Sequence, residues 1–377
     1  MTFDLLVVGA GIVGLAHALA AARSGRRVLV IDRDARANGA SIRNFGFVTV
    51  TGQRAGQVHA RALRSRDVWD EVAAATGLPV LHRGLLVAAH SPEAVAVLEA
   101  FADTDMGTDC ELLAPAAALA RCPQLAPEDL AAALWSPHER RVEPRQALPV
   151  LAQWLAEAHG VEFRFGTLVR SVERTGAAWR ARTTAGDVEA GAALVCSGGD
   201  FQTLFPERLA AYGLTLCKLQ MARTASQPMD WRLPCAVMSD SSLVRYDGYA
   251  MLPESAALRR RLGGEIPDTL AAGVHLIVVQ AADGSLVIGD SHDYGPTPDP
   301  FYRRDVEDLF LRELHRTLQV PERAIAERWI GLYPSSPHHV AFVDAPADGL
   351  RIALVTSGTG MSTAFAIGEE VVAGLFG

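Results

Sequence analysis

The sequence predicts an α/β protein with two domains. Three observations lead to this prediction. The chain has 377 residues, which exceeds the roughly 250–300 residues at which a single hydrophobic core stops growing. Near each end, an apolar run is followed by a glycine-rich turn and a helical pattern, as in "LLVVGAGIVG" and "LRIALVTSGTG". Between these ends, further strand-like runs, a hairpin pattern and helical patterns follow.

The composition is that of a globular protein, and it excludes several classes of function. With 49% hydrophobic residues, 21% charged residues and a formal net charge of -8, the chain lacks the signatures of disorder, collagen and coiled coil. The acidic excess argues against non-specific nucleic-acid binding, because that needs a basic face. Five widely spaced cysteines without a CxxC pair indicate reduced thiols in a cytoplasmic protein rather than a zinc ribbon.

An uncharged run from Leu5 to Ala22 is long enough to cross a membrane, but another interpretation fits it better. Asp4 precedes the run, no basic segment leads it, and glycines interrupt it. We therefore expect neither a membrane span nor a secretory signal here.

The same run predicts a strand, a tight turn and a helix that together bind a dinucleotide. Leu5 to Val8 suit a strand buried on both faces, and Gly9, Gly11 and Gly14 form a GxGxxG turn. The first glycine permits the sharp turn, the second lets the backbone approach a pyrophosphate, and the third lets the helix pack on the strand. A second predicted strand ends at Asp32, near the distance expected for a carboxylate that binds ribose hydroxyls.

The chain shows no second GxGxxG. A flavoprotein that draws electrons from NAD(P)H through a domain of its own would need two such folds, so we expect FAD to be the bound dinucleotide. Two other glycine turns fit flavin contacts. A predicted strand from Ala192 to Cys196 opens into Ser197 and Gly198, and the C-terminal helix begins near Gly358 and Gly360. The N-terminus of that helix would offer N–H groups to an electron-rich flavin carbonyl. An ordinary glycine-capped turn remains the alternative for each.

The middle of the chain supplies the remaining elements. We expect a helix from Pro144, a strand over 161–165 and a hairpin formed by "TLVRSVERTG" and "AAWRARTTAG". A strand in "GLLVAAH" and a helix in "SPEAVAVLEAFADTD" lie outside the nucleotide-binding frame, as do strand-like runs and a helix over 300–318.

Taken together, these motifs resemble the FAD-dependent oxidases of the D-amino-acid oxidase superfamily, which includes glycine oxidase and sarcosine oxidase. The GAGIVG turn, Asp32, "GASIRNFGFV", "VCSGGD" and "RWIGLYP…VTSGTGMS" occur in the order of that family. The resemblance implies a Rossmann-like FAD-binding domain with an interleaved α+β substrate domain on a mixed sheet. Its expected ranges are 1–83, 139–203 and 328–377 for the FAD-binding domain, and 84–138 and 204–327 for the substrate domain.

The resemblance also implies a set of FAD contacts. The GAGIVG turn would cradle the pyrophosphate, Asp32 and Arg33 would hold the ribose, Val169 would contact the adenine, and the remaining residues would line the flavin and ribityl side. The implied set is Gly9, Ala10, Gly11, Ile12, Val13, Gly14, Asp32, Arg33, Ser41, Arg43, Asn44, Phe45, Gly46, Val169, Ser197, Gly198, Gly331, Gly358, Thr359, Gly360, Met361 and Ser362.

Two positions depart from the family pattern. Gly331 stands where sarcosine oxidase-like members carry a cysteine joined to the flavin, so we expect non-covalent FAD. Val287 stands where those members place a lysine that activates oxygen, and Lys218 is the only lysine of the chain. An oxidase is favoured over a dehydrogenase, but the electron acceptor, O2 or another, stays open. His292 is the nearest cationic substitute, although a structural role is favoured for it, and we expect Lys218 near the substrate side of the cleft.

The substrate is expected to be a small anionic amine. Tyr333 stands where glycine oxidase-like members use an arginine that forks onto a carboxylate, so the anion must be met by other groups. The details "GASIRNFGFV", "CKLQMART" and "GDSHDYG" resemble a branch associated with phosphonate breakdown. That branch implies oxidative deamination of 2-aminoethylphosphonate or its N-methyl derivative by hydride transfer to flavin N5. The candidate substrate residues are Arg43, Tyr333, Arg223, Arg245, Tyr246 and His338.

Two alternatives remain from the sequence. One is glycine or sarcosine oxidase-like oxidation of an amino carboxylate, and the other is a flavoprotein without catalysis. No metal site is expected, because the closest pattern, His338 and His339, is adjacent rather than spaced by one helical turn.

Overall fold

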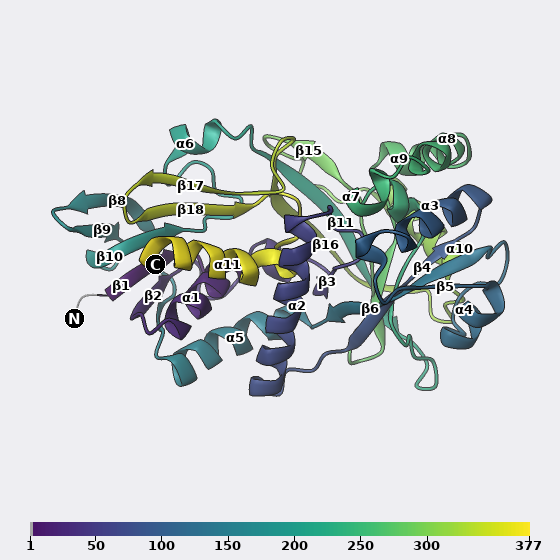
Figure 1. Cartoon of the computed structure of the whole chain (residues 1–377), viewed down its shortest axis with the longest axis horizontal. Helices are drawn as coiled ribbons and strands as arrows, with labels where there is room; N and C mark the ends of the chain where they lie inside the picture. Colours follow the sequence, from purple (N-terminus) through teal and green to yellow (C-terminus); the bar gives the residue numbers. More distant parts are fainter. Residues whose placement is uncertain (1–2) are drawn as a thin grey trace.

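The computed structural model describes residues 3–377 and contains two β-sheets, each with its own layer of helices, side by side along the length of the molecule (Figure 1). The C-terminus and the first described strand both belong to the half that holds the eight-stranded sheet. Among the described residues, no helix is both long enough and apolar enough to cross a membrane.

The eight-stranded sheet carries the predicted nucleotide-binding elements. Its main path runs β17-β18-β10-β1-β2-β7, and the strands from β18 to β7 along it are parallel. Its strands are β1 (Phe3–Val8), β2 (Val28–Ile31), β7 (Glu162–Arg164), β8 (Val169–Thr175), β9 (Ala178–Thr183), β10 (Val188–Val195), β17 (Ala341–Ala347) and β18 (Leu350–Val355). The hairpin of β8 and β9 extends the sheet beyond β10, as the sequence predicts.

Close helix packing explains the small residues around the first turn. Leu5, Leu6 and Val7 of β1 are fully buried, so this strand is covered on both faces. A Cβ on Gly14 of α1 would lie 1.9 Å from the carbonyl oxygen of Gly9, and one on Gly368 of α11 would lie 2.9 Å from the oxygen of Ala16. The helices of this half are α1 (Ile12–Arg23), α2 (Gln57–Thr76), α5 (Pro144–His159), α6 (Pro206–Ala210) and α11 (Gly360–Phe376).

The ten-stranded sheet forms the other half of the molecule. Its main path runs β15-β11-β14-β13-β12-β4-β6-β3, with β16 paired to β11 and β5 paired to β6. Its strands are β3 (Phe47–Val48), β4 (His82–Ala89), β5 (Glu111–Leu113), β6 (Ala132–Arg141), β11 (Thr215–Ser226), β12 (Ala236–Met238), β13 (Ile277–Gln280), β14 (Ser285–Gly289), β15 (Asp293–Gly295) and β16 (Ile325–Ser335). Parallel and antiparallel pairs both occur, so the sheet is mixed as expected.

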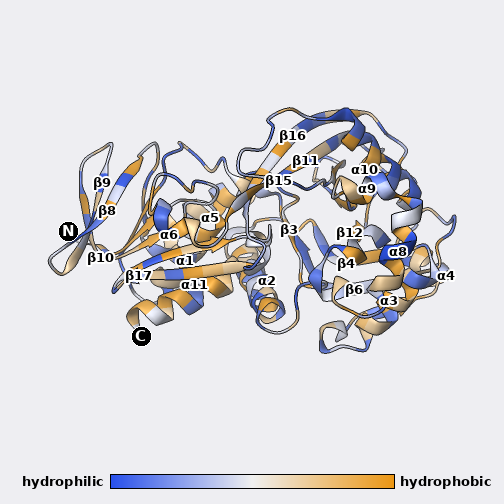
Figure 2. Cartoon of the chain, turned by 90° about the horizontal axis from the view of Figure 1, so that it is seen from above, coloured by the Kyte–Doolittle hydropathy of each residue, from blue (hydrophilic) through white to orange (hydrophobic). Residues whose placement is uncertain are grey.

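Helices cover this second sheet at the far end of the molecule (Figure 1). They are α3 (Pro92–Ala102), α4 (Pro115–Arg121), α7 (Asp247–Ala250), α8 (Ser255–Glu265), α9 (Pro267–Ala271) and α10 (Arg304–Thr317), with short 3-10 turns η1 (Ala40–Ile42), η2 (Asp105–Gly107) and η3 (Asp240–Val244). Figure 2 shows that α8 is mostly hydrophilic, whereas α11 is mostly hydrophobic. This difference follows burial, because α11 packs on α1 and α2.

Some expected bounds change. The helix expected over 300–318 begins only at Arg304, because the Pro-rich segment before it is irregular. β3, most of β16 and the ends of β4 and β6 fall within ranges expected for the FAD-binding domain, yet all four strands belong to the ten-stranded sheet. α6 lies in a range expected for the substrate domain but packs with the eight-stranded sheet. A division by sheet therefore differs from the expected division at these elements, and the domain boundaries themselves stay a prediction.

Candidate active site

A cavity of about 670 Å³ is lined by residues of both sheets. On one side it meets the carboxyl ends of the parallel strands β1, β2 and β10, where ligands bind in open α/β sheets. We call this side the glycine-rich wall, formed by the turns at 9–14, 197–199 and 358–362 with Asp32. The opposite side is the tyrosine-rich wall, formed by Arg245, Tyr246, Tyr294 and Tyr333 with His275, Asp290 and His292.

Most of the residues expected to bind FAD line this one cavity, although they come from distant parts of the chain. The lining includes Gly9, Gly11, Ile12, Val13, Asp32, Arg33, Ser41, Arg43, Asn44, Phe45, Val169, Ser197, Gly198, Gly331, Gly358, Thr359, Gly360, Met361 and Ser362. Their individual contacts with FAD stay a prediction.

Three expected FAD contacts lie outside the lining and serve the fold of the turns instead. Gly14 is the packing glycine described above. A Cβ on Gly46, whose φ is +66°, would lie 1.9 Å from the carbonyl oxygen of Val142, so this glycine allows a close backbone crossing. The Ala10 N–H donates to Asp32 Oδ2 at 2.6 Å, which ties the turn to the end of β2. All three positions thus support the fold of the turns, and their contacts with FAD stay a prediction.

The glycine-rich wall fits a dinucleotide. A Cβ on Gly11 would approach Ser41 Oγ at 3.1 Å and project from the start of α1, where a pyrophosphate needs room. The Ser197 hydroxyl is buried, lines the cavity and has no hydrogen-bond partner among the described residues. An unsatisfied buried hydroxyl at the end of β10 is a polar group available to a ligand.

The Asp32 carboxylate holds the backbone of its surroundings and can still accept hydrogen bonds from a ligand. Its Oδ2 accepts the Ala10 N–H and its Oδ1 accepts the Asp34 N–H at 2.8 Å. A carboxylate has about four lone-pair sites, so capacity remains for ribose hydroxyls. Arg33 forms an ion pair with Asp200 at 2.8 Å, which fixes its guanidinium beside the same part of the cavity.

The loop after η1 is held by its own side chains. Asn44 Nδ2 donates to the Ala40 oxygen at 2.8 Å, and Asn44 Oδ1 accepts the Gly46 N–H at 2.6 Å. Ser362 Oγ accepts the Thr49 N–H at 2.8 Å, which joins the start of α11 to the segment after β3. These bonds bring the glycine turn of α11 and the 40–49 segment together at the boundary between the two walls.

The tyrosine-rich wall places one cation among hydroxyl donors. Arg245 Nη2 donates to the Tyr294 hydroxyl oxygen at 2.6 Å. Burial raises the pKa of Tyr246, Tyr294 and Tyr333, so all three keep their phenolic protons at neutral pH. Tyr333 also reaches the glycine-rich wall, because a Cβ on Gly358 would lie 3.2 Å from its ring. A small anion held by this wall would therefore lie next to the turn that begins α11.

Two candidate substrate residues do not line the cavity. Arg223 is outside the lining because its guanidinium donates to Ser285 Oγ at 2.7 Å and pairs with Glu143 at 3.4 Å. His338 is an exposed loop residue, and its neighbour His339 contributes to the lining instead.

The single lysine lies beside the cavity lining but not in it. Lys218 Nζ donates to the Phe301 oxygen at 2.8 Å and does not line the cavity, although neighbours Leu216 and Leu219 do. Val287 is buried in the apolar core of β14, outside the lining. The described part of the chain thus places no lysine ammonium on either wall.

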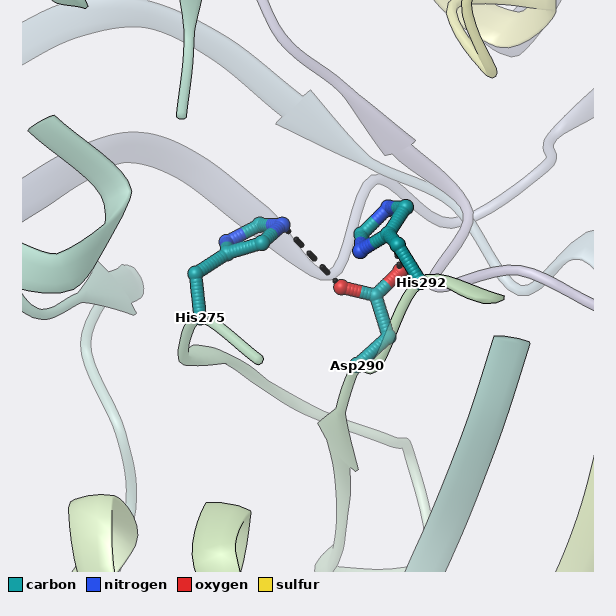
Figure 3. Close-up of side chains that lie close together, drawn as sticks. All are labelled: His275, Asp290 and His292. Carbon is teal, nitrogen blue, oxygen red and sulfur yellow. Dashed lines mark ion pairs between the residues drawn. The ribbon is translucent and has the colours of Figure 1, made fainter. Parts of the chain in front are cut away.

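The tyrosine-rich wall also contains a group of three polar side chains, His275, Asp290 and His292, of which only His292 was named from the sequence (Figure 3). Burial lowers the pKa of His292 to about 3, so its imidazole is neutral near pH 7. Burial opposes ionisation of Asp290, but His292, His275 and Arg245 outweigh it and hold the pKa of the carboxyl below its ordinary value. A signal existed, since Asp290, His292 and Tyr294 are alternate residues, which face one side of an extended segment.

Together, the fold and the cavity define a dinucleotide-binding α/β protein whose ligand meets a second, mixed sheet. The family described as FAD dependent oxidoreductase (DAO) matches residues 4–373. The chain belongs to this family, and the predicted FAD dependence and oxidoreductase class are confirmed. No curated protein matches the chain.

Solved structures share the fold over nearly the whole chain. Glycine oxidase from Bacillus cereus ATCC 14579 superposes with a TM-score of 0.78 at 16% identity, covering 99% of this chain and 95% of that one. L-Proline dehydrogenase from P. horikoshii gives 0.77 at 21% identity, covering 100% and 93%. L-α-Glycerophosphate oxidase from Mycoplasma pneumoniae, solved with FAD bound, gives 0.76 at 16% identity, covering 100% and 95%. Identities this low establish the fold alone.

Proposed function

We propose that the protein oxidises a small aminophosphonate, 2-aminoethylphosphonate or its N-methyl derivative, at the carbon next to nitrogen. A hydride and a proton leave the amine to give an imine, which water converts to phosphonoacetaldehyde and ammonia or methylamine. FAD supplies the two-electron acceptor for the hydride. The expected cytoplasmic location and the non-covalent attachment of FAD belong to this proposal, and Gly331 supports the latter because it offers no side-chain nucleophile.

The observation that carries the proposal is the distribution of donors on the tyrosine-rich wall. A phosphonate dianion has three oxygens and is best met by several donors around it, whereas a carboxylate suits one bidentate arginine. The sequence resemblance implies that Tyr333 stands at the arginine position of glycine oxidase-like members, and Arg245 lies beside Tyr294. The neutral phenols donate hydrogen bonds without adding negative charge.

The protein's own groups also set the geometry of oxidation. The anion, held by Arg245 and the phenols, would leave the amine carbon facing the space between the walls. The N–H groups at the start of α11, from Gly360 onward, would favour negative charge at the pyrimidine edge of the cofactor. The core of the ten-stranded sheet behind Tyr333 excludes water from that side, because Cys217 and Leu219 are buried there.

The second candidate is oxidation of an amino carboxylate, as the name of the similar glycine oxidase indicates for that protein. Arg43, which lines the cavity, would then be a cation available to the carboxylate. A flavoprotein without catalysis is the third.

Anaerobic mixing of the yellow protein with each amine separates these functions. We expect N-methyl-2-aminoethylphosphonate or 2-aminoethylphosphonate to bleach the flavin, with glycine and sarcosine much slower at equal concentration. Bleaching by glycine or sarcosine but by neither phosphonate would establish the second candidate. Absence of bleaching by every amine would leave the non-catalytic function. Re-oxidation of the bleached sample by air then tests whether O2 is the acceptor.

A further inference from the structure

Three ligating side chains converge on one point of the tyrosine-rich wall. His275 Nε2 lies 3.1 Å from Asp290 Oδ1, and His292 Nε2 lies 3.8 Å from Asp290 Oδ2 (Figure 3). One ligating atom of each residue lies within 4.8 Å of the other two. The side chains are only 4%, 7% and 6% exposed, in the order His275, Asp290, His292, yet all three line the cavity. They therefore form a buried cluster that opens toward the proposed substrate space.

The backbone holds this cluster in place before any ligand arrives. The backbone N–H of His275 donates to the backbone carbonyl oxygen of Asp290 at 3.2 Å, and the backbone N–H of Asp290 donates to the carbonyl oxygen of His275 at 3.0 Å. The His292 N–H donates to the Ala272 oxygen at 3.2 Å. Two segments distant in sequence are thus fixed side by side, and the cluster needs little reorganisation to bind a ligand.

The second nitrogen of each histidine fixes the tautomer. His292 Nδ1 lies 2.9 Å from the Gly273 carbonyl oxygen, which can only accept, so this nitrogen carries the proton. His275 Nδ1 lies 3.1 Å from Ser242 Oγ, and the Ser242 hydroxyl donates to the Leu276 oxygen at 3.1 Å. When the Ser242 proton goes to Leu276, Ser242 accepts from His275 Nδ1–H. In this state both Nε2 atoms have lone pairs on the side of Asp290.

The Asp290 carboxylate therefore faces one nitrogen of each histidine. Asp290 Oδ1 is buried and accepts no hydrogen bond from the described residues. A buried carboxylate oxygen without a donor is costly. A cation bound between the three residues would satisfy this oxygen and both lone pairs at once.

We propose that His275, Asp290 and His292 bind a divalent first-row transition metal ion. Two imidazoles and one carboxylate, with open positions left over, form a common site for such ions. Ligand atoms about 2.0–2.1 Å from a tetrahedral ion lie about 3.3 Å apart, and the two histidine–carboxylate distances of 3.1 and 3.8 Å bracket that value. The hydrogen bonds from Nδ1 are the outer-shell contacts that metal-binding histidines usually make. This proposal differs from the sequence-based expectation of no metal site, which rested on His338 and His339.

The metal would also complete the anion site, an inference that rests on the proposed function. Asp290 and Arg245 bring one negative and one positive charge to this wall, so together they offer a dianion no net attraction. A divalent ion changes the balance to two positive charges, which matches a phosphonate dianion. Its open positions face the cavity, so a phosphonate oxygen would complete the coordination.

Calorimetric titration of chelator-treated, FAD-loaded protein with ZnCl2, without substrate, tests the site. We expect one tight site per chain, and Asp290→Asn and His292→Gln should each weaken it by at least about 10-fold. His159→Ala, at the end of α5 and far from the cavity, should bind as the native protein does. The visible flavin spectrum reports whether each variant is folded. Absence of zinc binding by the native protein, or equal binding by two folded cluster variants, would overturn the proposal.

A second titration separates this inference from the proposed function. Methylphosphonate should perturb the flavin spectrum at a concentration at least about 10-fold lower when the cluster is loaded with Zn²⁺. An unchanged concentration would overturn the role of the metal in anion binding. If zinc binds at the cluster but no aminophosphonate bleaches the flavin, the metal site stands and the proposed function fails. If an aminophosphonate bleaches the flavin but zinc does not bind, the proposed function stands and the metal site fails.

Discussion

At the glycine-rich wall of the cavity the polar groups belong mainly to the main chain, whereas at the tyrosine-rich wall they belong to side chains. The turn of Gly9 to Gly14 is shaped by steric limits, since added Cβ atoms would strike backbone oxygens. The other wall is shaped by Arg245, the phenols and the cluster around Asp290. Main-chain groups can bind a cofactor while few positions require a particular side chain. A wall formed by side chains can change its ligand when single residues are substituted.

The largest effect is expected from a substitution in the turn of the glycine-rich wall. Gly14→Ala places a Cβ 1.9 Å from the Gly9 oxygen, a backbone atom that cannot move without opening the turn. We expect the FAD-loaded state to lose about 4 kcal/mol, so that the purified protein is colourless or insoluble. Gly263→Ala in α8, where a Cβ would meet open space, serves as the control and should keep its flavin. Flavin absorbance per protein measures the outcome, and a fully yellow Gly14→Ala protein would contradict it.

The next effect is confined to the tyrosine-rich wall. Arg245→Met removes the cation paired with the Tyr294 hydroxyl, and we expect the proposed phosphonate substrate to bind about 100-fold more weakly with normal flavin content. The KM for flavin reduction measures this change. Arg182→Met, on the exposed hairpin strand β9, should change it by less than about 2-fold. An unchanged KM for Arg245→Met would show that another cation holds the anion.

A third prediction concerns stability at low pH, because each half of the molecule buries one neutral histidine outside the cavity. Burial lowers the pKa of His17 in α1 to about 4 and that of His82 in β4 to about 3, both from 6.5. The native state therefore favours their neutral forms. Their contribution is full above about pH 6.5 and is lost as the pH falls toward the native values. Each should cost about 2 kcal/mol between about pH 7.5 and about pH 5.

Urea unfolding at these two pH values tests the assignment. His82→Gln should lose about 2 kcal/mol less than the native protein on acidification, while the amide oxygen can still accept the Gln280 N–H. The exposed His338→Gln is the matched control. If His82→Gln and the native protein lose equal stability, another group controls the acid transition.

The smallest effect concerns the lone lysine. Lys218→Met removes one hydrogen bond to the Phe301 oxygen and should cost about 1 kcal/mol of stability. Because the ammonium does not line the cavity, the rate at which O2 re-oxidises the reduced flavin should not change. Stopped-flow re-oxidation provides the measurement. A large loss of rate would mean that the ammonium acts on the cavity despite its position.

Much of the glycine-rich wall was predictable, because its determinants are local. Glycine at fixed spacing after a buried strand sets the turn, and the turn sets the start of α1, whatever surrounds it. The exceptions are instructive. Ala10, Gly14 and Gly46 support the turns rather than the cavity, since a motif marks where the backbone bends but not which side each residue faces.

The tyrosine-rich wall was only partly predictable. Arg245, Tyr246 and Tyr333 do line the cavity, whereas Arg223 is held by Glu143 and Ser285 and His338 lies on the surface. The partner of Asp290 was also hidden, because His275 lies 15 positions earlier and meets it through reciprocal backbone hydrogen bonds.

By itself, the sequence determined the fold class, the dinucleotide turn and the FAD-dependent family, since these depend on residue spacing along single strand–turn–helix units. Only the tertiary structure decided which charged side chains are neutralised by neighbours and which stay available to a ligand. That depends on distances between segments far apart in the chain. Arg223 and Lys218 are satisfied by such neighbours, whereas Asp290 Oδ1 is buried without a donor and faces two histidines.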